Sequence, residues 1–153
     1  MTFKIRLIPD RYHLHDIGKL ESGAFCWITL QLHWDGEDTR DFVATYIFDA
    51  DGRLIQHIID DLGLRSGPSG KSAKSVIAEH KRLIGPIEPT DIWVSPFSVS
   101  AYGLEFGLIE RKLDPDDDPE YLEKLKEDGP LVDAMPGHTL MFYPPWDEGL
   151  YDS

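Results

Sequence analysis

Two histidines that lie two residues apart, His13 and His15, are the first residues of this 153-residue chain whose spacing could support chemistry. On an extended segment their imidazoles point to the same side, so both could bind one metal ion. A metal site needs three or four converging ligands, and only these two are close in sequence. The alternative interpretation is a polar surface strand that carries both histidines together with Asp16.

A second candidate is the glycine-rich segment 67–72, which precedes a predicted helix. Glycines free backbone amides, and a lysine at the start of a helix can reach a phosphate. The segment resembles the end of a phosphate-binding loop, but Arg65 occupies the position where that motif requires its first glycine. The alternatives are a general anion site and a loop in which Ser69 or Ser72 caps the helix. The anion site would consist of Arg65, Ser69, Gly70 and Lys71.

Three further side chains are candidates for acid–base or ligand-binding roles. His80 lies on the apolar stripe of the predicted helix, where it is either a base with a shifted pKa or a core histidine satisfied by a hydrogen bond. The same alternatives apply to His57 on a predicted strand. Glu105 lies between Gly103 and Gly107, and these glycines indicate either a shallow groove or a bend in the strand.

Other chemistries find no support in the sequence. The acidic run 114–118 suggests a calcium loop, but Pro119 and Leu125 occupy the positions that require glycine and glutamate. Ser69 lacks the glycine spacing of a nucleophile elbow. Cys26, the single cysteine, is interpreted as a small core residue. One cysteine also excludes an internal disulfide framework.

The charge of the chain is strongly negative and unevenly distributed. The formal net charge is −13, and residues 114–153 contain 12 acidic residues but only two basic ones. A negative surface repels phosphate groups, so direct binding to nucleic acid or to an anionic membrane is disfavoured. Such a surface accelerates association with a basic protein, although a solvated acidic face is the simpler interpretation.

The C-terminal tail, residues 144–153, combines acidic and aromatic residues. Its aromatic content argues against disorder, because disordered segments have low hydrophobicity. Either the tail docks on the body of the protein through Trp146 and Tyr151, or Trp146 and Tyr143 are anchors for a partner. The residues expected to contact a basic partner are Asp116, Asp117, Tyr143, Trp146, Asp147 and Glu148.

Hydrophobic periodicity predicts the elements that position these residues. Strands are expected at 3–8, 24–34, 39–48, 53–59, 92–94, 99–111 and 138–143. Turn residues at 35–36 and 49–52 join three of them into an antiparallel meander. Helices are expected over 72–83 and from Asp118 to Gly129. The fold class is therefore α+β, with a mainly antiparallel sheet of about six to seven strands and two short helices.

The sequence indicates a single globular domain over residues 1–153 with an acidic aromatic tail. It has no apolar run of about 20 residues and no N-terminal signal peptide, so we expect a cytoplasmic protein. No motif identifies a cofactor or decides whether the protein is an enzyme. The leading hypothesis is an acidic protein-interaction domain, for example an inhibitor or immunity-like binder of a basic partner protein. The alternatives are a small metal- or anion-dependent enzyme or ligand-binding domain that uses a pocket at the sheet, and a structural homodimer.

Overall fold

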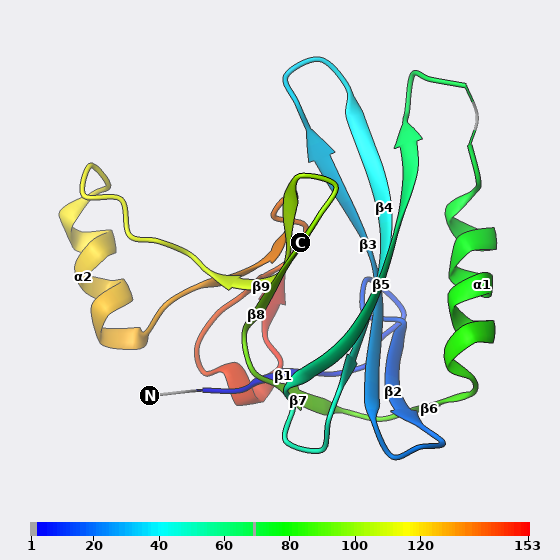
Figure 1. The fold of residues 1–153 in the computed structure, drawn as a ribbon. Coiled ribbons are helices and arrows are strands. Elements are labelled where there is room, and N and C mark those ends of the chain that lie inside the picture. Colours follow the sequence, from blue (N-terminus) through cyan, green and yellow to red (C-terminus); the bar gives the residue numbers. More distant parts are fainter. Residues whose placement is uncertain (1–2, 69) are drawn as a thin grey trace.

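The computed structural model describes residues 3–68 and 70–153, which form three antiparallel sheets and two α-helices (Figure 1). The strands are β1 (Ile5–Leu7), β2 (Asp16–Leu20), β3 (Phe25–Trp34), β4 (Thr39–Phe48), β5 (Leu54–Leu64), β6 (Ile87–Pro89), β7 (Ile92–Val94), β8 (Phe97–Ala101), β9 (Leu104–Glu110), β10 (Val132–Met135), β11 (Met141–Phe142) and β12 (Tyr151–Asp152). The helices are α1 (Ala73–Ile84), α2 (Pro119–Asp128) and the 3-10 turn η1 (Trp146–Glu148).

Two five-stranded sheets form the body of the protein. The first sheet has the strand order β5-β4-β3-β2-β6, and the second sheet has the order β12-β11-β10-β9-β8. A two-stranded sheet of β1 and β7 contributes to the same core. Helix α1 covers the outer face of the first sheet, and α2 lies on the opposite side of the molecule, beside the second sheet (Figure 1).

The alternation of side chains along the meander β3-β4-β5 builds the core. Trp27, Phe42 and Tyr46 are fully buried and pack with Phe106 and Leu108 of the second sheet. The other face of the first sheet also carries apolar side chains, and these pack against α1.

That second contact is made by Ile28 and Val43, which cluster with Val76 of α1. The first sheet is therefore covered on both faces, and this explains why every residue from Phe42 to Phe48 of β4 is buried.

Local signals define both helices. The Ser72 side chain accepts a hydrogen bond from the Ser75 amide at the start of α1, and Gly85 ends that helix. Asp118 caps α2 and Pro119 occupies its first turn. Neither helix, in the part of the chain that the structure describes, has the length and hydropathy needed to cross a membrane.

The structure confirms the α+β class and the antiparallel pairing, but the expected number of strands was wrong. Residues 3–68 and 70–153 contain twelve strands instead of six to seven. The predicted strand 99–111 is divided by a tight turn at Tyr102 and Gly103, whose φ angles are 53° and 74°. Several of the other strands have only two to five residues, which is too short for alternation to be recognised.

Candidate functional site

The most distinctive surface element is the segment 114–129, which comprises α2 and the loop before it and is called the α2 arm below. It carries eight acidic residues and two lysines. All eight carboxylate-bearing residues are exposed, and none of the described residues of α2 is buried. The predicted contact residues Asp116 and Asp117 lie in the loop of this arm. The arm therefore presents negative charge to solvent along its whole length.

Elsewhere in the molecule, seven of the 20 acidic residues lie within 4.0 Å of a basic or histidine side chain. Within residues 3–68 and 70–153, no carboxylate of the α2 arm forms an ion pair. The paired carboxylates, all outside the arm, belong to Asp16, Asp41, Asp60, Asp61, Glu79, Asp91 and Asp133. The excess of acidic residues in the sequence of the α2 arm is therefore also an excess of unpaired negative charge on its surface.

A groove separates α2 from the second sheet. It has a volume of about 550 Å³ and is lined from α2 by Tyr121 and Leu125 and from the other side by Leu131, Met141 and Tyr143. Tyr143, one of the predicted partner-binding residues, therefore lies directly opposite the arm. The remaining lining residues are Arg111, Lys124, Asp128, Gly129, Pro144 and Asp152.

Arg111 connects the groove to a buried carboxylate. Its Nε and Nη2 atoms donate hydrogen bonds of 2.8 and 2.6 Å to the two oxygens of Asp133, whose side chain is 3% exposed. This bond raises the pKa of Arg111, with a smaller contribution from the Tyr121 hydroxyl. The positive charge of Arg111 is therefore compensated by Asp133.

The tail docks on the body of the protein. Trp146 stacks on Phe3 with a ring distance of 4.0 Å, and a Cβ added to Gly129 would meet the Trp146 ring. η1 therefore lies against the C-terminal end of α2, where Asp147 and Glu148 are exposed. The predicted contact residues consequently flank α2 at both ends, while the Trp146 ring itself is engaged by Phe3.

Tyr151 fixes the end of the tail through Asp10. The Tyr151 hydroxyl donates a hydrogen bond to Asp10, whose other oxygen accepts the amides of Tyr12, His13 and Leu14. Burial alone would raise the pKa of Asp10, but these hydrogen bonds together lower it. Burial and the bond to Asp10 raise the pKa of Tyr151 to about 12.

A second cavity gathers histidines. His13 and His15 line the same space of about 510 Å³, as their spacing suggests, and His138 joins them from the loop after β10. His138 has a φ of 50°, and its Nδ1 lies 3.4 Å from the Asp133 carboxylate. Among the residues that the structure describes, no group of three histidine, cysteine or acidic side chains is arranged to hold a metal ion.

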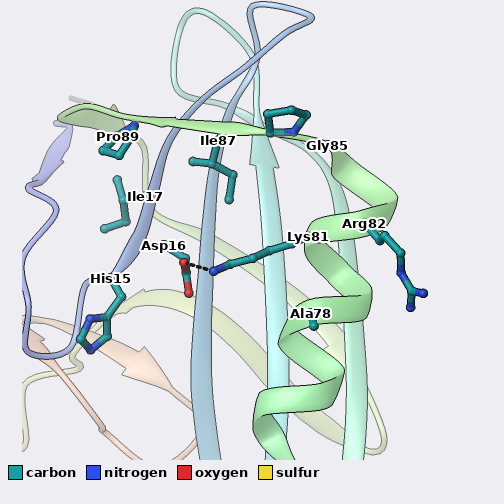
Figure 2. A pocket seen from close by; sticks show the side chains of 10 residues that line it. His15, Asp16, Ile17, Ala78, Lys81, Arg82, Gly85, Ile87 and Pro89 are labelled. Carbon is teal, nitrogen blue, oxygen red and sulfur yellow. Dashed lines mark ion pairs between the residues drawn. The ribbon is translucent and has the colours of Figure 1, made fainter.

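Another cavity, of about 620 Å³, lies between the C-terminal half of α1 and the edge of β2. Figure 2 shows Lys81 extending from α1 toward Asp16, with an Nζ–Oδ1 distance of 2.8 Å, while Arg82 points away from this pair. His15 and Asp16 line this cavity as well as the histidine cavity. The ion pair compensates Lys81 and Asp16, whereas Arg82 forms no ion pair with any residue that the structure describes.

The predicted anion site has basic groups that already have partners. Arg65 donates hydrogen bonds of 2.8 and 2.9 Å to Asp41, which raises the pKa of Arg65. Lys71 lies 3.6 Å from Glu79. Gly70 is part of the described loop, whereas Ser69 lies outside the described residues. The anion site remains a prediction that these contacts do not favour.

His80 forms a hydrogen-bonded network inside the protein. Its Nδ1 lies 2.6 Å from the Thr45 hydroxyl and its Nε2 lies 2.6 Å from the Asp60 carboxylate. Thr45 is fully buried, so the network joins α1 to β4 and β5 rather than presenting a nucleophile. His57 is exposed on β5.

Glu105 accepts hydrogen bonds from Ser100 and Ser98, which lower its pKa. The flanking glycines have separate roles: Gly103 is in the hairpin turn, and Gly107 lies against the Phe97 backbone. The expected groove at Glu105 is therefore not formed by these glycines.

Comparison of the chain with protein-family models, with characterised proteins and with solved structures gives no match. The residues that sequence reasoning missed are Arg111, Tyr121 and Met141 at the groove, and His138 at the histidine cavity. His138 was expected only as the first residue of the predicted strand 138–143, and no local signal marked any of these residues as functional.

Proposed function

We propose that this protein is a protein-binding domain whose α2 arm engages a basic partner protein. The observation that supports the proposal is the set of eight exposed carboxylates on the arm, none of which has a cation partner in the described part of the chain. An inhibitor or immunity-like binder of a basic enzyme is the concrete form of this function.

Electrostatics gives the arm two effects on a basic partner. Uncompensated charge attracts the partner over roughly one Debye length, which is about 10 Å at 0.1 M salt. Such steering raises association rates by about 10- to 1,000-fold and weakens steeply as salt increases. Isolated surface charges add little affinity, about 0 to 1 kcal/mol for each pair. The arm is therefore expected to act mainly on the rate of association.

The test compares two variants with the same net charge. The arm variant carries Asp116→Asn, Asp117→Asn, Glu123→Gln and Glu127→Gln, four exposed acids of the arm. The control variant carries Glu21→Gln, Glu37→Gln, Asp51→Asn and Glu88→Gln, four exposed acids elsewhere on the surface. Immobilised proteins are exposed to cell lysate at low and high salt, and retained proteins are quantified by mass spectrometry.

We expect a basic protein to be retained by the wild type and by the control variant at low salt. The arm variant should retain about tenfold less, because a slower association reduces capture. The association rate of that protein, once isolated, should show the same difference. Equal retention by all three proteins would show that the charge of the arm does not recruit a partner.

A second candidate function is small-ligand binding or catalysis at the histidine cavity. The specific observation is that three of the six histidines line one cavity. NMR titration with Zn²⁺ and with inorganic phosphate tests it, because the imidazole Cε1–H resonances report binding directly. A ligand site predicts shifts for His13, His15 and His138 but not for the exposed His57. Uniform shifts, or none, would remove this candidate.

A further inference from the structure

We infer that the groove between α2 and the second sheet receives an apolar side chain of the partner, flanked in the partner's chain by lysine or arginine. This inference depends on the proposed function and specifies where the partner is held. A basic segment with one apolar anchor is the occupant whose chemistry matches the groove.

The walls of the groove are largely apolar. Leu125 and Met141 face the space from opposite sides, and Leu131 is 9% exposed. Tyr121 is 39% exposed at its wall. The volume of about 550 Å³ falls in the range of about 300–1,000 Å³ that is usual for ligand pockets. The groove therefore accommodates a large side chain, but it is too small to hold a folded domain.

The charges around the groove favour a cationic neighbour of that side chain. Arg111 is bonded to Asp133, so its charge is already compensated. Of the other charged lining residues, Asp128 and Asp152 are acidic and Lys124 is basic. The remaining seven carboxylates of the arm extend this negative region. A lysine or arginine next to the anchor would face these groups, whereas an acidic peptide would be repelled.

An apolar anchor is required because charge alone gives weak binding. Exposed ion pairs contribute little, while binding energy concentrates in a few buried side chains surrounded by a polar rim. The groove and its acidic surroundings have this arrangement. The arm would then speed the encounter, and the groove would slow dissociation.

The test uses two capped nonapeptides that carry the same charge, each with eight lysines around a central residue. One peptide has leucine at the centre and the other has serine. We expect the leucine peptide to bind the wild type about 10- to 100-fold more tightly at low salt, the value expected for burying one leucine side chain. Fluorescence anisotropy of labelled peptides measures both dissociation constants.

Two variants show whether the groove is responsible. Leu125→Trp fills the groove without changing charge, so it should abolish the preference for leucine and leave serine-peptide binding unchanged. Leu83→Trp is the control, since Leu83 is 71% exposed on α1, and it should preserve the preference. Met141→Trp replaces Leu125→Trp if that variant does not fold. NOE contacts between the peptide leucine and Tyr121 give an independent measurement on the wild type.

The outcomes separate the two proposals. If the serine peptide binds the wild type no better than it binds the neutralised arm variant, the proposed function fails. If the serine peptide binds through the arm but leucine adds less than threefold, the inference about the groove is overturned and the proposed function stands. An undiminished leucine preference in Leu125→Trp and Met141→Trp, without contacts to Tyr121, would also overturn it.

Discussion

Replacing Arg111 by methionine tests how strongly the buried carboxylate of Asp133 depends on its partner. The Asp133 side chain is 3% exposed and accepts two hydrogen bonds from the guanidinium, at 2.6 and 2.8 Å. Methionine preserves most of the apolar stem of arginine but removes both donors. Arg111→Met therefore leaves a buried carboxylate without its principal cation.

The expected loss follows from that geometry. Removing one member of a buried ion pair destabilises a protein by about 3–5 kcal/mol. His138 remains 3.4 Å from the same carboxylate, and its side chain is 60% exposed, so water can enter beside it. We therefore expect the lower end, about 3 kcal/mol. With an m value of about 2 kcal/mol/M, the urea midpoint should fall by about 1.5 M.

Two further variants show whether the loss of the Arg111–Asp133 ion pair causes the destabilisation. Arg111→Met combined with Asp133→Leu removes the stranded charge, so the double variant should recover to within about 1 kcal/mol of the wild type. Arg82→Met, at an exposed arginine of α1, should change stability by less than about 0.5 kcal/mol. The reasoning is refuted if Arg111→Met unfolds at the wild-type urea concentration, or if the double variant is as unstable as the single one.

Three other predictions concern the core, the tail and one glycine. Thr45→Val should lower the free energy of unfolding by about 1–3 kcal/mol, because the buried His80 Nδ1 loses its hydrogen-bond partner. Thermal or urea unfolding measures this loss. Thr90→Val, at an exposed threonine, is the control and should leave stability unchanged. Tyr151 has a folded pKa of about 12 against an ordinary value of 10.0, so its stabilising contribution is present below pH 10 and is lost as pH rises through 12. The urea midpoint of the wild type should therefore fall more steeply over this interval than that of Tyr151→Phe, and parallel profiles would count against the Tyr151–Asp10 bond. Gly107→Ala should destabilise by about 3 kcal/mol, since its φ is 147° and its Cβ would lie 2.1 Å from the Phe97 carbonyl oxygen. Gly23→Ala, at a φ of 92° in open space, should lose only about 1 kcal/mol, and equal losses in the two variants would contradict the steric explanation.

The sequence alone was sufficient to predict the secondary-structure elements that depend on local chemistry. The meander over 24–59, the two helices and their caps follow from alternation, helical periodicity and capping residues. The structure contains them near the predicted bounds, except that β5 continues to Leu64, five residues beyond its predicted end. The short strands β6, β10 and β12 could not be predicted in this way. They have two to four residues, and their pairing partners rather than their own periodicity make them strands.

The negative charge of residues 114–153 and the pairing of His13 with His15 were likewise visible in the sequence. Only the tertiary structure decided which carboxylates are compensated, that Tyr143 faces α2 across a groove, and that His138 joins the other two histidines. The physical reason is that periodicity and capping act over a few residues, whereas most of these contacts join residues about 20 to 125 positions apart. Such contacts exist only after the sheets have stacked and both helices have found their places on opposite sides of the molecule.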